Sequence, residues 1–221
     1  MGHCSCQDTV VYSKIAEDRG YDSVWVSEDL GFRDAVTQLA SVAASTHRIK
    51  LATGILPIYY RTPALAAMTI AALDELSHGR AILGIGTGAS YLQKQGIESE
   101  SPLRAMEEFI FVVRRLLSGR SLTYQGHIYR LTDVELSFRP LNPQIPIYVA
   151  ARGPRMLTLA GKLADGVLAN DGFCAEKYIR WALDNVKVGA ENAGRKARDI
   201  TFASLVWVSV SEDRDEAKEY V

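Results

Sequence analysis

The sequence predicts an α/β fold built on parallel strands. Short apolar runs alternate with helix-length amphipathic segments along most of the 221 residues, and glycine or proline marks many of the boundaries between them. Hydrophobic residues make up 48% of the chain, enough to form a sizeable core, so we expect one domain over residues 1–221. Strands that alternate with helices of this length are typical of βαβ construction.

The first half of the chain gives three such alternations. Residues 9–20 read as a helix with Val11, Ile15 and Ala16 on its inner face, and the strand 22–27 follows. A helix over 33–46 leads to the strand 49–55. The next predicted helix has Pro63 near its start and Gly79 at its end, which is the usual punctuation of a helix. We expect its inward residues to be Leu65, Met68, Ala72 and Leu76.

The second half interrupts the alternation once and then resumes it. After a strand at 80–88 and a helix at 103–119, an insertion over about 118–146 contains a predicted hairpin around Gln125–Gly126. The remaining predicted elements are the strand 146–151, the helix 154–164, the strand 166–170, the helix 176–194 and the strand 200–211.

Six core strands follow from this pattern, at Ser23, Ile49, Ala81, Ile147, Val167 and Ile200. A doubly wound open sheet can use six strands, whereas a (β/α)₈ barrel needs eight. The chain begins with a helix and stops as another begins. A barrel would therefore lack its first and last strands.

Composition narrows the classes of function. A net charge of −1 argues against a nucleic-acid-binding surface, and no apolar run reaches the length of a membrane span. The first residues lack the apolar stretch of a secretory signal, so we expect a cytoplasmic protein. Three cysteines, without partner Cys or His pairs, predict neither a disulfide framework nor a metal site.

The carboxyl ends of the strands are where both candidate folds place their ligands. These ends are rich in glycine and carry no Ser-His-Asp set, no metal-ligand cluster and no lysine, which suggests that a cofactor supplies the chemistry. They are Ser27–Asp29, Thr53–Ile55, Gly86–Ala89, Ala151–Pro154 and Asn170–Asp171.

Two of these ends have a specific pattern. Gly84, Gly86 and Gly88 alternate along a strand, which indicates a face stripped of side chains where a planar ring can lie. The segment Ala151–Pro154 runs from a strand into a helix, with Arg152 and Arg155 beside the helix start. From the residues alone, an anion-binding turn and an ordinary turn with solvated arginines are both open. The residues alone also leave two roles open for Glu28 and Asp29. They could bind a ligand or transfer a proton, or they could cap a helix.

Four segments of the chain resemble the luciferase-like flavin and deazaflavin superfamily, most closely its coenzyme F420-dependent, methylenetetrahydromethanopterin reductase-like branch. They are "YDSVWVSEDL", "HRIKLATGILP", "RTPALAAMTIAALDELSHGRAILGIGTG" and "PIYVAARGPRMLTLAGKLADGVLAN". The resemblance implies an incomplete (β/α)₈ barrel with an insertion. Truncation at both ends, a partner that supplies the two strands, and a pared-down flavin-holding relative each explain the missing strands, and we favour truncation. It also implies F420, or FMN as the alternative, as the cofactor.

The same resemblance assigns site residues. It implies a non-proline cis peptide at Gly54–Ile55 behind the ring, with Ile55 backing the central ring. The residues that it places in cofactor binding are Thr53, Gly54, Ile55, Thr87, Gly88, Ala89, Ala151, Arg152, Gly153, Pro154 and Asn170. Glu28 and Asp29 match an acid–histidine pair near the reactive ring edge, and Asp29 replaces the histidine. Ala89 stands where F420-dependent sugar-phosphate dehydrogenases carry a catalytic glutamate, which argues against that activity.

The resemblance therefore implies an oxidoreductase that transfers a hydride between F420 and a small organic substrate, with Glu28 and Asp29 as the catalytic candidates. Two alternatives remain, an FMN-dependent luciferase-like monooxygenase and a non-catalytic flavin-binding protein on an incomplete barrel. We expect a small-molecule substrate and a second copy of the chain as partners.

Overall fold

The computed structural model describes residues 4–88, 92–169 and 175–219, and its centre is a parallel β-sheet. All six predicted core strands are present, with an additional two-residue strand, β3, that pairs with β4. The strand order is β1-β2-β4-β7-β8-β9, and every pairing in this sheet is parallel. The strands are β1 (Ser23–Val26), β2 (Lys50–Thr53), β3 (Leu56–Pro57), β4 (Ala81–Gly86), β7 (Ile147–Ala151), β8 (Gly166–Ala169) and β9 (Thr201–Ser204).

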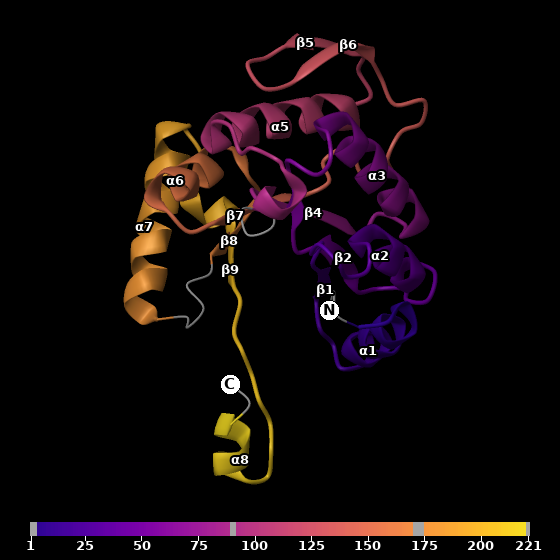
Figure 1. Ribbon diagram of the computed structural model, residues 1–221, viewed down its shortest axis with the longest axis vertical. Helices are drawn as coiled ribbons and strands as arrows, with labels where there is room; N and C mark the ends of the chain where they lie inside the picture. The colour runs from indigo at the N-terminus through magenta and orange to yellow at the C-terminus, as the bar shows by residue number, and fades with distance from the viewer. Residues whose placement is uncertain (1–3, 89–91, 170–174, 220–221) are drawn as a thin grey trace.

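Helices α1 to α7 lie in an arc around the outside of these strands, and α8 lies apart from them (Figure 1). Proline stands at the first helical position of α3, α5 and α6, where its missing N–H group costs nothing. The helices are α1 (Cys6–Asp18), α2 (Ala35–Ala43), α3 (Pro63–Leu76), α5 (Pro102–Leu117), α6 (Pro154–Leu163), α7 (Glu176–Asn192) and α8 (Arg214–Glu219). Two short 3₁₀ helices, η1 (Gln93–Gln95) and η2 (Ala197–Asp199), complete the described elements.

The predicted hairpin is present as the antiparallel pair β5 (Leu122–Gln125) and β6 (Arg130–Val134). Glu108 of α5 fixes its turn, because its carboxylate accepts the backbone N–H groups of His127, Ile128 and Tyr129 at 2.8–3.1 Å. Figure 1 shows the hairpin lying against α5, on the outside of the molecule. The insertion is therefore attached to the helix layer rather than to the central sheet.

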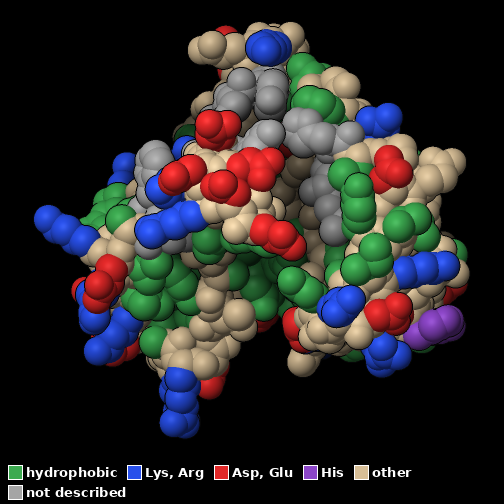
Figure 2. All heavy atoms as spheres, turned by 90° about the horizontal axis from the view of Figure 1, so that it is seen from below, with side chains coloured by type: hydrophobic (Ala, Val, Ile, Leu, Met, Phe, Trp, Pro, Cys, Tyr) green, Lys and Arg blue, Asp and Glu red, His purple; other side chains and the backbone are tan. Residues whose placement is uncertain are grey.

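The sheet curves into an open half-barrel. Within the described part of the chain, β1 and β9 each pair with one strand only, so the barrel is open between them. Figure 2 shows a notch between two lobes of the molecule, in which hydrophobic side chains gather. After β9 the chain runs away from the body towards α8 (Figure 1). Trp207 and Val210 in this segment are exposed. The described residues contain no helix long and apolar enough to cross a membrane.

Two predicted helix faces are wrong. Leu65, Met68 and Leu76 of α3 are 40–47% exposed, and Ala72 is exposed as well. The helix packs inward through a different set of residues, among them Ala67, Ile70 and Ala71. The same holds for α1, where Val11 and Ile15 are exposed while the polar Thr9 and Ser13 are buried. In α3 the apolar residues extend around the whole helix, so their spacing alone does not indicate which face is buried.

Candidate functional site

A cavity of about 740 Å³, the barrel-mouth cavity, lies at the carboxyl ends of the strands. Its size is typical of a small-molecule or cofactor site. Loops and strand ends from both halves of the chain line it, including segments after β1, β2, β4, β7 and β9. Its lining residues include Trp25, Ser27, Glu28, Asp29, Gly54, Ile55, Pro57, Tyr60, Gly86, Thr87, Gly88, Ala150, Ala151, Arg152, Gly153, Met156, Leu168, Ala203 and Ser204.

The turn between β2 and β3 forms one wall of this cavity. Its peptide bond Gly54–Ile55 is cis, which confirms the prediction from the resemblance. Backbone hydrogen bonds fix the turn to β1, from Gly54 N to Val26 O at 2.7 Å and from Glu28 N to Ile55 O at 3.3 Å. Thr53 lies behind the turn, fully buried, and its hydroxyl bonds both backbone groups of Gly84 at 2.8 and 2.9 Å. Thr53 therefore supports the wall from behind.

The alternating glycines of β4 make room for this turn. A Cβ atom on Gly86 would lie 2.9 Å from Cδ1 of Ile55, and one on Gly88 would lie 2.5 Å from Cβ of Pro57. The stripped face predicted from the sequence is thus partly covered by the chain's own turn. Gly86 and Gly88 still reach the cavity, so their backbone and the Ile55 side chain together form a wall without polar side chains.

Trp25 and Tyr148 meet inside the half-barrel, and Trp25 also lines the cavity. Their rings pack edge to face with centroids 5.3 Å apart, and the indole N–H of Trp25 donates to Ser23 Oγ at 2.9 Å. The sequence gives little indication that Trp25 lines a cavity, because an aromatic residue inside a buried strand is usually a core residue. Only its position, two residues before the end of the predicted strand 22–27, could have indicated it.

Glu28 lies in an ion-pair network at the edge of the cavity. Its two carboxylate oxygens accept from Nε and Nη2 of Arg61, each at 3.0 Å, and the same Nη2 donates to Asp34 at 2.5 Å. Burial by itself lowers the pKa of Arg61, but the hydrogen bonds and charges of Glu28 and Asp34 outweigh it and raise that pKa. The guanidinium is therefore permanently charged, and it holds Glu28 in place.

Asp34 caps α2, the role that the sequence leaves open for Asp29. Its carboxylate accepts from the backbone N–H of Thr37 at 2.7 Å and from the Thr37 hydroxyl at 2.8 Å. Burial raises the pKa of Asp34, but the bonds from Thr37 and Arg61 lower it by more. Asp29 itself lines the cavity and is half-buried.

The start of α6 forms another part of the rim. Gly153 is the N-cap residue of α6 and has no side chain. It therefore cannot accept a hydrogen bond from the first N–H groups of the helix. Arg152 and Gly153 line the cavity, and the carbonyl of Arg152 accepts from the hydroxyl of Tyr178 at 3.4 Å. This geometry suits an anion, because backbone N–H groups and the positive helix end face the same place.

The predicted site residues are thus largely brought together. Nine of them line the cavity: Glu28, Asp29, Gly54, Ile55, Thr87, Gly88, Ala151, Arg152 and Gly153. Thr53 lies behind its wall, and Pro154 lines a second cavity outside the barrel. Ala89 and Asn170 lie outside the described residues. Residues 4–88, 92–169 and 175–219 contain no group of three or more His, Cys, Asp or Glu side chains that could hold a metal ion.

Comparisons with known proteins agree with this geometry. The sequence model of the luciferase-like monooxygenase family matches residues 4–221. The chain belongs to this family. It groups with the F420-dependent members. One relative is 5,10-methylenetetrahydromethanopterin reductase of Archaeoglobus fulgidus, 38% identical over 208 residues that cover 94% of this chain and 61% of the relative. Another is the F420-dependent glucose-6-phosphate dehydrogenase of Amycolatopsis mediterranei, 32% identical over 96% of this chain and 68% of the relative.

A solved structure gives the same result for the fold. The coenzyme F420-dependent tetrahydromethanopterin reductase of Methanopyrus kandleri superposes with a TM-score of 0.93 at 30% identity. The superposition covers 99% of this chain and 67% of that one. This luciferase-like family member thus spans about two thirds of the length of its relatives. The expected incomplete barrel of the luciferase-like type is confirmed.

Proposed function

We propose that this luciferase-like protein binds coenzyme F420 in the barrel-mouth cavity and acts as an oxidoreductase on a small organic substrate. The observation that carries the proposal is the cavity itself. A wall of glycine backbone and Ile55 faces a space of about 740 Å³ with few ionisable groups, in a chain whose relatives include F420-dependent enzymes. A site with so little chemistry of its own depends on a cofactor for the redox step.

The residues present fit a deazaflavin. The wall formed by Ile55, Gly86 and Gly88 offers an apolar face to a planar tricyclic ring. Arg152 and Gly153 at the start of α6 offer a cation and backbone N–H groups to a phosphate. The two groups line one cavity, so a single ligand with a ring at one end and a phosphate on its side chain can contact both.

When bound, F420 supplies the hydride acceptor or donor of the reaction. The protein's part is to position and shield the reacting atoms. Ile55, Pro57 and Met156 exclude water from the ring face. Asp29 holds or transfers a proton at its carboxylate, because it lines the cavity. Glu28 orients the loop that carries Asp29, since both of its oxygens are bound by Arg61.

The substrate is a small organic molecule that accepts or donates a hydride, as in a methylenetetrahydromethanopterin reductase. The relatives include F420-dependent glucose-6-phosphate dehydrogenases, but this chain has Ala89 where the resemblance places their catalytic glutamate. A methyl group cannot transfer a proton. We therefore favour the reductase-like substrate class over a sugar phosphate.

We also propose a homodimer as the working form. The exposed apolar side chains of α3, Leu65, Met68 and Leu76, lie on one stripe of the helix and are 40–47% exposed. A contiguous exposed apolar surface is typical of protein–protein contacts.

Anaerobic titration with F420 and with FMN, followed by cofactor fluorescence, tests the cofactor. We expect saturable binding of F420 and weaker binding of FMN. Turnover is then followed by the visible absorbance of F420. It should appear when reduced F420 reacts with methylenetetrahydromethanopterin as the hydride acceptor, and it should disappear when oxidised F420 reacts with glucose 6-phosphate as the hydride donor. Binding of neither cofactor would refute the proposal. Binding without turnover for either substrate would favour a non-catalytic flavin-binding protein instead.

A further inference from the structure

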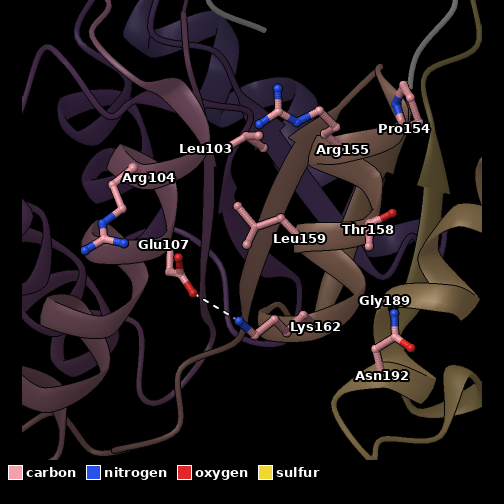
Figure 3. Close-up of a pocket in the computed structure, with 10 residues that line it drawn as sticks. All are labelled: Leu103, Arg104, Glu107, Pro154, Arg155, Thr158, Leu159, Lys162, Gly189 and Asn192. Atoms are coloured by element: carbon pink, nitrogen blue, oxygen red, sulfur yellow. Dashed lines mark hydrogen bonds and ion pairs between the residues drawn. The ribbon is translucent and has the colours of Figure 1, made fainter.

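A second cavity lies outside the half-barrel, between α5, α6 and α7. It is an open groove of about 570 Å³, and Figure 3 shows ten of its lining residues. Leu103 of α5 and Leu159 of α6 form its apolar part. The ion pair between Lys162 Nζ and Glu107 Oε1, at 3.1 Å, crosses the groove at its lower end in this view.

The groove and the barrel-mouth cavity adjoin at the starts of two helices. In α5, Pro102 lines the barrel-mouth cavity and the next residue, Leu103, lines the groove. In the same way, Gly153 lines the barrel-mouth cavity and Pro154 lines the groove at the start of α6. A ligand whose anionic end contacts Arg152 and Gly153 therefore lies next to Pro154, the first residue of α6 that lines the groove.

The groove carries an excess of positive charge. Three of its side chains are cationic, Arg104, Arg155 and Lys162, and one is anionic, Glu107. Lys162 is paired with Glu107, and Arg104 donates to the buried Glu108 at 3.0 Å. Among the residues that the structure describes, Arg155 has no ion pair, and Figure 3 shows its side chain extending across the top of the groove towards Leu103. A carboxylate in the groove can bind this guanidinium.

We propose that the groove binds the anionic chain that F420 carries beyond its phosphate. This inference rests on the proposed function. Beyond the phosphate, F420 continues as a chain of γ-linked glutamates, in which short methylene segments alternate with carboxylates. The methylenes suit Leu103 and Leu159, and the carboxylates suit Arg155. FMN ends at its phosphate and cannot reach the groove. The groove therefore contributes to the preference for F420 over FMN.

The test compares three ligands by the change in deazaflavin fluorescence at low salt: F420 with a long glutamate tail, F420 with a single glutamate, and the deazaflavin riboside that lacks phosphate and tail. We expect the long tail to bind about 3- to 10-fold more tightly than the single glutamate. A single exposed ion pair changes affinity by roughly 1.5- to 5-fold, and the contacts of the methylene segments with Leu103 and Leu159 add to the pair with Arg155. The advantage should shrink as salt rises, because ions screen exposed charges.

The variant Arg155→Gln removes the groove's unpaired cation while keeping a polar side chain. We expect it to weaken binding of the long-tailed form about 2- to 5-fold and to leave the riboside unchanged. Arg155→Glu should weaken it further. The matched control is Arg198→Gln, which removes a cation that is 78% exposed. Arg198 lies just before β9, at the amino ends of the strands, whereas the cavity lies at their carboxyl ends. The control should leave the affinities of all three ligands unchanged.

Equal affinities for the two tail lengths, or an Arg155→Gln variant that keeps the wild-type ratio between them, would overturn the inference about the groove. In either case binding of all three ligands leaves the proposed function standing. If none of the three binds, the proposed function fails and the inference fails with it.

Discussion

Arg61 binds both carboxylate oxygens of Glu28, with two bonds of 3.0 Å, and the two side chains are only 17% and 16% exposed. A planar guanidinium matches a carboxylate in this fork geometry, which fixes the direction of both groups. The pair joins the loop after β1 to the segment before α3. It therefore holds the edge of the cavity on which Asp29 lies.

Replacing Arg61 with methionine should destabilise the protein. The change leaves the carboxylates of Glu28 and Asp34 without their shared cation in a partly buried place, and we expect the free energy of unfolding to fall by about 2 kcal/mol. Chemical denaturation measures this. The control Arg180→Met breaks a pair with Glu176 in which both side chains are at least 75% exposed, and it should cost less than about 0.5 kcal/mol. Equal losses in the two variants would contradict a supporting role for Arg61.

Gly88 and Gly96 offer a comparison between backbone and packing effects. Both have a φ angle of 65°, but a Cβ added at Gly88 would lie 2.5 Å from Cβ of Pro57, whereas one added at Gly96 would have nothing within 4 Å. Gly96→Ala should cost about 1 kcal/mol, from the left-handed backbone alone. Gly88→Ala should cost more and should also weaken F420 binding, because Pro57 must move at the cavity wall. Thermal or chemical unfolding of both variants checks this, and equal costs would show that the wall tolerates the added methyl group.

Glu108 should make the free energy of unfolding depend on pH in the acidic range. Burial raises its pKa, but three backbone N–H groups and Arg104 outweigh this and lower the pKa to about 2, from the usual 4.5. The carboxylate therefore stabilises the fold above pH 4.5, and this contribution is lost as the pH falls towards 2. Its upper limit is about 3 kcal/mol.

The variant Glu108→Gln isolates this contribution. We expect it to be clearly less stable than the wild type at pH 7, with a difference that narrows below pH 4.5. Glu107→Gln is the control, since Glu107 pairs with Lys162 through side chains that are 40% and 50% exposed, respectively, and should matter little. Denaturation curves across this pH range test the prediction. A difference that does not change with pH would mean that the charge of Glu108 is not what anchors the hairpin.

The proposed homodimer can be tested on α3. Met68 is 46% exposed within the apolar stripe, so Met68→Glu should convert a dimer into a monomer without unfolding the chain. Light scattering coupled to size-exclusion chromatography gives the mass. Lys14→Glu, an exposed change on α1, serves as the charge control. A wild-type chain that is monomeric at all concentrations would refute the dimer.

The strands and their carboxyl ends could be predicted from the sequence, because buried parallel strands read as short apolar runs between helices and present ligands at the same edge. For this reason Glu28, Gly54 and Arg152 could be identified, although they are far apart in the chain. The orientation of α3 could not be predicted. Its outward Met68 and inward Ile70 are both apolar, and their spacing does not show which one is buried.

The ion-pair network of Arg61 with Glu28 and Asp34 also could not be predicted from the sequence. Arg61 and Glu28 are 33 residues apart, and no spacing rule links a loop after one strand to the start of a later helix. Trp25 was missed for a similar reason, since an aromatic side chain within a strand predicts core packing. Its position on the cavity follows from the curvature of the sheet, which strand patterns do not specify.

The barrel-mouth cavity is the proposed seat of the deazaflavin ring. Ala150 lines this cavity beside Gly86, and its Cβ would lie 3.3 Å from a methyl group added at Gly86. Equilibrium titration of the wild type and of Ala150→Phe with F420 probes this seat, with Ala44→Phe, at the exposed carboxyl end of α2, as the control. We predict that Ala150→Phe weakens F420 binding at least tenfold while the control binds like the wild type. Unchanged F420 affinity in a folded Ala150→Phe protein would mean that the ring lies elsewhere.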